Sequence, residues 1–325
     1  MTDLTLTILG CGSAKPTLRH HTSSQLLECL GELYMIDCGE GTQQQLLRYN
    51  IHPGKLQNIF ISHAHGDHCL GLVGMLSSWA LNGRQEEVNI YVTSDFEPIL
   101  QAQIGFFIHH AEFSIRIHTV DCLEPSVIFE DRSFSVTAFP LNHRVPCYGF
   151  LFKEKEGKRH HRKECIEQYG IPFTQCEAIR SGADFVTAEG VTIPNDLLTT
   201  PPDNPRSYAY VCDSRPVPEH ADLLHGVDLL YHDSTYMNDQ LDKACTYCHS
   251  TAGEAAQFAA KCDAGLLLLG HVSSRYESDE DLLLREAVEQ FPRVQLADEG
   301  LQLKIMGQNG NGPQVHSQHL AEKNF

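Results

Sequence analysis

The segment ISHAHGDHCLGL, residues 61–72, places four potential metal ligands directly after an apolar run. His63, His65, Asp67 and His68 fall within six residues, before a helix-like sequence. In an extended turn His63 and His65 project to the same side, whereas Asp67 and His68 are displaced toward a neighbouring point. Core hydrogen bonds would account for one such histidine but not for all four residues. The segment therefore favours two adjacent metal sites over one.

Zinc sites need more ligands than this segment supplies, so the others must come from distant strand ends. Three polar residues each follow an apolar run: His143 in NHRVPCYGF, Asp213 in YVCDS and His271 in LLLLGHVSSRY. Taken singly, each is more often a turn or cap residue. Together they are spaced as ligands gathered along one edge of a sheet would be.

Composition limits the class of protein and its partners. The chain has 325 residues, 42% of them apolar, with a formal net charge of −18. This length allows one large layered domain or two small ones. The negative field would repel nucleic acid and anionic membranes, so any polyanionic partner must meet a local basic patch.

The cysteines and the N-terminus indicate the compartment. Twelve cysteines lack the spacing of a disulfide framework, and the first residues form a strand-like pattern instead of a signal region. We therefore expect a cytoplasmic protein with reduced thiols. No apolar run reaches the roughly 18 residues of a membrane span, so we expect no membrane partner.

Short apolar runs bounded by turn residues occur in both halves of the chain. They predict strands at 4–9, 33–37, 58–62, 88–93, 134–139, 208–213, 227–233, 265–271 and 301–306. Helical patterns such as TAGEAAQFAAKC and DEDLLLREAVEQF separate the later strands. This mixture predicts α/β layers in which helices lie outside two sheets.

An insertion at about 153–206 interrupts this pattern with polar and turn-rich sequence. Residues 153–180 contain seven Lys or Arg against five Glu, and two adjacent histidines, so this part of the insertion is locally basic. On composition alone, an ordinary solvated excursion is an equal alternative. We interpret residues 1–306 as a single domain that carries this insertion, and 307–325 as a polar, mobile C-terminal tail.

The ligand pattern and its neighbouring motifs resemble those of a known superfamily. The HxHxDH cluster followed by His143, Asp213 and His271 is similar to the metallo-β-lactamase superfamily. DCGEGTQQQL, HAHGDHCLGL, NHRVPCYGF, HSTAGEAA and GHVSSRY resemble tRNase Z, the zinc endoribonuclease family that matures tRNA 3′ ends. The resemblance extends from LGCGSAKPT to SSRY. It implies an αββα sandwich of two mixed β-sheets flanked by helices.

The resemblance also implies two zinc ions per chain at the edge of the sheets. The implied ligands are His63, His65, His143 and Asp213 for one ion, and Asp67, His68, Asp213 and His271 for the other. Asp213 would bridge the ions, a role that a carboxylate can fill and an imidazole cannot. Two zinc ions that share a hydroxide lower the pKa of its parent water toward about 7 and supply the nucleophile.

The implied reaction is hydrolysis of precursor tRNA after the discriminator nucleotide, which leaves a 3′-hydroxyl on the tRNA. Asp67 would orient the bridging hydroxide and receive its proton, and His249 would protonate the leaving oxygen. Asp233 occupies the position at which the family has a glutamate near this histidine. Because an aspartate is one methylene shorter, we expect Asp233 to reach His249 only through a water.

His249 allows two other interpretations, because it lies in CTYCHST, residues 245–251. The first five residues match the attachment pattern of c-type haem. Without an export signal, haem attachment is not expected. A structural histidine at a helix start is the other alternative, since Ser250 or Thr251 can cap a helix that Glu254 helps begin.

Four further residues are possible contacts for substrate phosphates. Thr42 lies at a predicted helix start after a glycine-rich turn, and Ser273, Ser274 and Arg275 follow the ligand His271. Residues of these types are common in ordinary loops, and only their closeness to the implied metal ligands favours contact with substrate phosphates.

Members of the tRNase Z family act as homodimers, in which the arm of one subunit grips tRNA for the partner's site. The insertion occupies the place of that arm, so the resemblance implies precursor tRNA and a second copy of this chain as partners. The alternatives are another hydrolase of the superfamily, such as a small-molecule phosphodiesterase or arylsulfatase, and a non-catalytic RNA-binding scaffold that uses zinc for folding.

Overall fold

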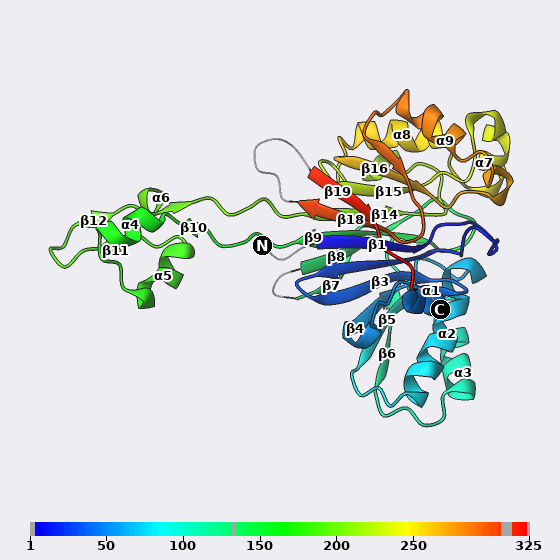
Figure 1. Ribbon diagram of the computed structural model, residues 1–325, viewed down its shortest axis with the longest axis horizontal. Coiled ribbons are helices and arrows are strands. Elements are labelled where there is room, and N and C mark those ends of the chain that lie inside the picture. Colours follow the sequence, from blue (N-terminus) through cyan, green and yellow to red (C-terminus); the bar gives the residue numbers. More distant parts are fainter. Residues whose placement is uncertain (1–3, 132–133, 307–313, 324–325) are drawn as a thin grey trace.

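The fold is a sandwich of two mixed β-sheets with helices on both outer faces, and an arm projects from one end (Figure 1). The computed structural model describes residues 4–131, 134–306 and 314–323. Helices α1 to α3 lie against the first sheet, and α8 and α9 lie outside the second. The αββα sandwich predicted from the sequence is therefore confirmed.

The first sheet has the strand order β19-β18-β1-β2-β3-β4-β5-β6. Its strands are β1 (Leu4–Gly10), β2 (Ser24–Cys29), β3 (Glu32–Cys38), β4 (Leu56–Phe60), β5 (Val88–Thr93), β6 (Ile115–Val120), β18 (Leu301–Met306) and β19 (Gln314–His319). Strands β3 to β6 run parallel, and the other neighbours pair antiparallel. The connecting helices are α1 (Thr42–Arg48), η1 (Pro53–Lys55), α2 (Gly66–Leu81) and α3 (Glu97–Phe107).

The second sheet has the strand order β17-β16-β15-β14-β9-β8-β7. Its strands are β7 (Ser126–Glu130), β8 (Phe134–Pro140), β9 (Tyr148–Glu154), β14 (Ser207–Val211), β15 (Leu229–Asp233), β16 (Leu266–Gly270) and β17 (Val294–Leu296). Strands β14 to β17 run parallel. The helices are η2 (Pro218–His220), η3 (Asn238–Gln240), α7 (Leu241–Tyr247), α8 (Ala252–Lys261), η4 (Ser274–Tyr276) and α9 (Asp281–Val288).

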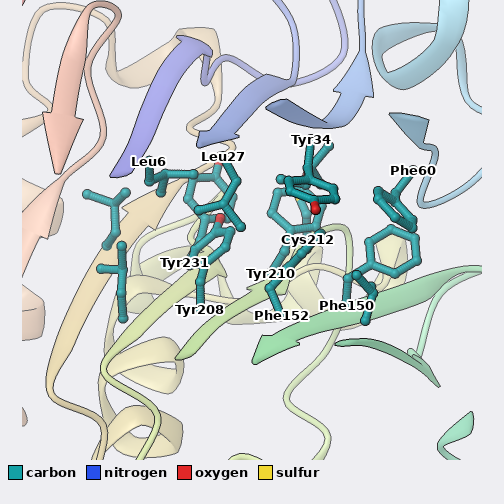
Figure 2. Close-up of a cluster of buried hydrophobic side chains, with 14 of the residues drawn as sticks. Leu6, Leu27, Tyr34, Phe60, Phe150, Phe152, Tyr208, Tyr210, Cys212 and Tyr231 are labelled. Atoms are coloured by element: carbon teal, nitrogen blue, oxygen red, sulfur yellow. The ribbon is translucent and has the colours of Figure 1, made fainter. Parts of the chain in front are cut away.

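Aromatic side chains fill the space between the sheets. Figure 2 shows Tyr34 and Phe60 from the first sheet facing Phe150 and Tyr210 from the second. Tyr210 is fully buried, and its hydroxyl donates a hydrogen bond to Asp37 Oδ2 over 2.6 Å. A buried tyrosine hydroxyl needs such a partner. The core is therefore joined to the strand end at which Asp37 lies.

The insertion forms the arm, which leaves the body between β9 and β14 (Figure 1). Its elements are β10 (His160–His161), α4 (Lys163–Gln168), α5 (Phe173–Arg180), β11 (Phe185–Val186), β12 (Thr192–Ile193), α6 (Asn195–Leu198) and β13 (Thr199–Thr200). Strand β10 pairs with β13, and β11 pairs with β12. Ile171, Ile179, Phe185, Ile193 and Leu198 form a small buried cluster. The arm thus has its own core and is not an irregular loop.

The C-terminal region differs from the predicted tail. Residues Gln314–His319 form β19, which pairs antiparallel with β18 at the sheet edge. Main-chain pairing and the packing of Val315 against the core outweigh the polar composition of this segment. The predicted tail also includes 307–313 and 324–325, which lie outside the described residues. In the part of the chain that is described, no helix has the length and apolarity to cross a membrane.

Candidate metal centre

The site lies where strands of both sheets end. Strand β4 leads into the segment that contains His63 and His65, while Asp213 follows β14 and His271 follows β16. His143 lies in the connection from β8 to β9. The sandwich therefore brings together histidines and carboxylates that are far apart in the sequence.

The first ligand group consists of His63, His65, His143 and Asp213, whose ligand atoms all lie within 4.8 Å of one another. His65 Nδ1 is 2.9 Å from His63 Nε2 and 3.3 Å from His143 Nε2. Asp213 Oδ2 is 3.5 Å from His63 Nε2 and 3.9 Å from His143 Nε2. Three imidazoles and one carboxylate oxygen thus converge on one point.

The second group lies on the other oxygen of Asp213. Asp213 Oδ1 is 2.9 Å from His271 Nε2 and 3.3 Å from His68 Nε2. Asp67 Oδ2 is 3.4 Å from His271 Nε2 and 3.6 Å from His68 Nε2. Asp213 therefore directs one oxygen toward each group, the arrangement that a bridging carboxylate requires.

These side chains fit a pair of zinc ions. His68 Nε2 is buried and makes no hydrogen bond, although it points at two carboxylates. Burial lowers the pKa of His63 and His65, and it lowers that of His143 to about 4. These three imidazoles are therefore neutral at physiological pH, the form in which histidine binds a metal.

The second group is the more strongly charged half of the site. Burial alone would lower the pKa of His271, but Asp213 and Asp67 outweigh it and raise this pKa to about 10. Burial would raise the pKa of Asp213, yet the charges of His271 and His68 hold it well below its usual value. The carboxylates remain ionised and attract a cation.

Left-handed turns aim the ligands. Asp213, two residues past the end of β14, has a φ of 49°, and His271, directly past the end of β16, has a φ of 56°. This conformation costs a non-glycine residue roughly 1–3 kcal/mol, so the surrounding structure must impose it. Asp37, at the bulge in the pairing of β3 with β2, has a φ of 57°. Strain of this kind concentrates at functional sites.

Asp37 is a site residue that sequence reasoning missed. Its Oδ2 lies 2.6 Å from His68 Nδ1 and accepts hydrogen bonds from the hydroxyls of Tyr210 and Ser62. Its Oδ1 accepts from the backbone N–H of Ser62. A carboxylate in this position fixes the orientation of a metal-binding imidazole. Its place at a strand end in DCGEG was the available signal.

Cys212 is a second residue that the sequence did not single out. Its Sγ lies within 4.8 Å of the ligand atoms of His68, Asp213 and His271. The side chain is fully buried, and burial raises the pKa of its thiol well above the usual value. The thiol is thus protonated and packs in the core beside the second ligand group.

His249 contacts Asp233 directly, so the expectation of an intervening water is wrong. His249 Nδ1 lies 2.8 Å from Asp233 Oδ2. Asp233 is the last residue of β15, and its other oxygen accepts hydrogen bonds from the N–H and hydroxyl of Thr235. Those contacts and the backbone N–H of Ser214 hold the shorter side chain toward His249. The ring of His249 lies 5.6 Å from that of His143, between centroids.

The segment CTYCHST joins α7 to α8. Thr251 caps α8, and its side chain and that of Glu254 form a capping box, as the sequence suggested. Cys248 takes a φ of 58°, and its carbonyl lies 3.3 Å from His143 Nδ1. Cys248, the second cysteine of the segment, therefore contacts His143 of the first ligand group through its carbonyl. The side chain of His249 contacts Asp233 instead.

A cavity of about 540 Å³ opens over both ligand groups and is lined by Asp67, Asp213, His249 and His271. The predicted phosphate contact Ser273 also lines it, and Arg275 lies over the ring of Tyr236, another lining residue. Ser274 begins η4 next to them. Lys15 and Arg144 also line the cavity and add positive charge to it.

Thr42 does not belong to this cavity. It is the first residue of α1, as predicted, but it is 1% exposed and its hydroxyl donates to the carbonyl of Gly39. The hydroxyl closes the turn before the helix, so it is not available to a substrate phosphate.

Comparisons with known proteins place the fold and the family. A ribonuclease Z of Bacteroides fragilis is 43% identical over 305 residues, which cover 94% of this chain and all of that protein. The crystal structure of the short form of human tRNase Z has a TM-score of 0.68 at 26% identity and covers 92% of this chain and 98% of that chain.

Two further matches concern the fold and the N-terminal half. The metallo-β-lactamase fold protein YhfI from Bacillus subtilis has a TM-score of 0.66 at 20% identity, over 94% of this chain and all of that one. The family model of the anti-Pycsar protein Apyc1 matches residues 4–159, less than half of the chain. With 43% identity over nearly its whole length, the chain belongs to the ribonuclease Z family.

Proposed function

We propose that the protein is a zinc-dependent endoribonuclease that removes 3′ trailers from precursor tRNA. It hydrolyses the phosphodiester bond after the discriminator nucleotide and leaves a 3′-hydroxyl on the tRNA. One observation carries the proposal: two ligand groups share Asp213 in the cavity that also contains the hydrogen-bonded pair of His249 and Asp233. A structural metal site would be closed and would not need a proton donor.

The two ligand groups around Asp213 would hold two zinc ions, which would activate a water and polarise the phosphodiester. His249 bonds Asp233 through Nδ1, which leaves Nε2 for the substrate. From there it would give a proton to the leaving 3′ oxygen, which is a poor leaving group without one. Asp233 fixes the tautomer and the orientation of the ring.

Asp67 would act on the attacking water. The backbone N–H of Ala14 donates a 2.7 Å hydrogen bond to Asp67 Oδ2 and holds the carboxylate in the cavity. Burial would raise the pKa of Asp67, but the charges of His68 and His271 outweigh it and lower this pKa. Asp67 is thus ionised, as a group that orients a water and receives its proton must be.

The position of the arm supports a homodimer that binds tRNA with both subunits. His143 precedes β9 and Asp213 follows β14, whereas the arm begins where β9 ends and stops where β14 starts. Its root is therefore separated from the site by the length of β9, about 20 Å for seven residues. An arm that points away from its own site (Figure 1) suits a substrate bound in the partner subunit.

Two finer features belong to the same proposal. Lys158, Arg159, Arg162 and Lys163 form a basic stretch of the arm that would meet tRNA phosphates. Lys158 pairs with Glu177 and Arg159 with Asp196, so Arg162 and Lys163 are the stronger candidates for these contacts. The twelve cysteines are free thiols, which supports a cytoplasmic location.

The test is cleavage of a precursor tRNA transcript that carries a 3′ trailer. We expect one cut after the discriminator nucleotide, a 3′-hydroxyl on the tRNA and a 5′-phosphate on the trailer. Chelation should abolish cleavage and added zinc should restore it. Turnover of small phosphodiesters without tRNA cleavage would favour a small-molecule hydrolase, and tRNA binding without any turnover would favour a scaffold.

A further inference from the structure

Arg215 lies two residues after the shared ligand Asp213 and contacts the segment that carries His249. Its Nη1 donates 2.7 Å hydrogen bonds to the carbonyl of His249 and to Glu254 Oε2. Its Nη2 donates to Glu254 Oε1. The side chains of Arg215 and Glu254 are only 18% and 20% exposed. This paired geometry is specific to a guanidinium and a carboxylate.

Glu254 in turn fixes the start of α8. Its side chain accepts a hydrogen bond from the backbone N–H of Thr251, while the hydroxyl of Thr251 accepts from the N–H of Glu254. His249 lies just before this capping box, and its own N–H donates to the carbonyl of Ala244. The guanidinium of Arg215 therefore holds both the carbonyl of His249 and the helix start that follows it.

The backbone around Arg215 reaches the remaining parts of the site. The N–H of Arg215 donates to the carbonyl of Asn142, the neighbour of the ligand His143. Ser214 donates its N–H to Asp233 and accepts a hydrogen bond from the hydroxyl of Ser250 at its carbonyl. The turn that contains Asp213 is thus hydrogen-bonded to Asp233, the partner of His249, and to Ser250, the residue after His249.

We propose that Arg215 is a positioning residue for proton transfer, which sets the distance between His249 and the ligand Asp213. The inference rests on the proposed role of His249 as the proton donor to the leaving oxygen. Displacement of a catalytic group by about 1 Å can cost roughly a hundredfold in rate. Arg215 joins the segment of His249 to the turn that contains Asp213, and so it fixes the position of His249 relative to Asp213.

The experiment removes both charges of the pair. Arg215→Met together with Glu254→Gln avoids an unpaired buried charge, and glutamine can still accept the hydrogen bond of the capping box. We expect kcat on precursor tRNA to fall by about tenfold to a hundredfold, with KM and zinc content nearly unchanged. Bis(4-nitrophenyl) phosphate should lose less than about threefold, because its leaving group departs without a proton.

A second measurement repeats the double substitution in a His249→Ala background. If Arg215 acts through His249, the substitutions should cause no further loss on precursor tRNA there. Arg84→Met is the matched control, because Arg84 also donates to backbone carbonyls, those of Pro53, Leu56 and Glu86, but lies away from the cavity. Arg84→Met should leave the ratio of kcat on precursor tRNA to kcat on bis(4-nitrophenyl) phosphate unchanged.

Three results would overturn the inference. They are an equal loss on both substrates, a loss of zinc with the double substitution, and a full additional loss in the His249→Ala background. If His249→Ala itself lowers kcat equally on both substrates, the proposed role of His249 as the proton donor is wrong as well. That outcome can be distinguished from a wrong inference about Arg215 alone. In the latter case His249→Ala still lowers kcat on precursor tRNA more than on bis(4-nitrophenyl) phosphate.

Discussion

Asp213 is the residue on which both ligand groups depend, because it directs Oδ2 to His63 and His143 and Oδ1 to His68 and His271. We expect about two zinc ions per chain in the wild-type protein. Asp213→Ala should lose zinc from both groups and lose activity with it. Metal analysis of the purified proteins measures this directly. An active wild-type preparation with one zinc or none would contradict the shared-ligand arrangement.

Asp37 should control zinc affinity without touching the metal. In Asp37→Asn, an NH₂ group in place of Oδ2 would face the ring of His68 and the hydroxyls of Tyr210 and Ser62, and it cannot accept from them. We expect zinc affinity of the second group to fall by about tenfold to a hundredfold.

Competition with a fluorescent chelator measures the affinity of Asp37→Asn. Asp228→Asn is the matched control, since Asp228 is also buried and accepts from the N–H and hydroxyl of Ser207, at the far end of β14. Equal zinc affinities in the two variants would show that Asp37 only stabilises the fold.

The grouping of the site's histidines and carboxylates could be predicted from the sequence, because each lies next to a strand pattern. His143, Asp213 and His271 each follow an apolar run, and such ends meet at one edge. The position of Asp37 at a strand end was a sequence signal, but its role and that of Arg215 depend on partners brought close only by the fold. The direct contact of Asp233 with His249 depends likewise on how two strand ends and a helix start are placed.

Strands with a clear apolar pattern could be predicted from the sequence, whereas a strand that forms by pairing with its neighbour could not. The predicted strand at 88–93 coincides with β5, and 301–306 coincides with β18. Strand β19 was missed because its sequence, QVHSQH, has little apolar alternation, and it forms by edge pairing with β18. Edge strands of this kind are determined by their partner more than by their own composition.

The arm is the element whose removal separates binding from chemistry. Glu154 and Arg206 lie side by side at its root, where the N–H of Glu154 donates to the carbonyl of Arg206. A short glycine-serine linker can therefore replace residues 157–203 without disturbing β9 and β14. A deletion of residues 155–182 alone would be worse, because it would remove β10 and leave its partner β13 unpaired.

We expect the arm deletion to weaken binding of precursor tRNA and to flatten its salt dependence, because fewer phosphate contacts release counterions. Turnover of a small chromogenic phosphodiester should persist. Binding measured from about 50 to 200 mM salt gives the slope for both proteins. If the folded deletion variant lost turnover of the small substrate, the arm would be part of the active site.

At the scale of the whole molecule, a buried ionic network ties the two ends of the chain together. His20 lies 2.8 Å from Glu280 and 3.7 Å from Glu299, and Cys11 Sγ is 3.5 Å from its Nδ1. The loop that it anchors also supplies the N–H of Ala14 to Asp67. The sequence pattern does not indicate this network, because Glu280 follows His20 by 260 residues.

This network predicts a pH dependence of stability. Burial alone would lower the pKa of His20, but hydrogen bonds with Cys11, Glu280 and Glu299 outweigh it and raise this pKa to about 12. The folded protein therefore keeps a proton that the unfolded chain releases above about pH 6.5. The stabilisation is complete below that pH and is lost as the pH rises toward 12, by about 1.4 kcal/mol per unit.

We expect the free energy of unfolding to fall less steeply with pH in His20→Gln than in the wild type. Glutamine can still donate to Glu280, but it carries no proton that titrates. Urea unfolding at pH 7, 8 and 9, with zinc held constant, should give slopes that differ by about 1.4 kcal/mol per pH unit. His118→Gln is the control, because the ring of His118 contacts the amide of Asn89 and not a carboxylate. Parallel slopes for wild type and His20→Gln would mean that His20 is neutral in the folded protein, so that hydrogen bonds without a buried charge anchor the loop over Asp67.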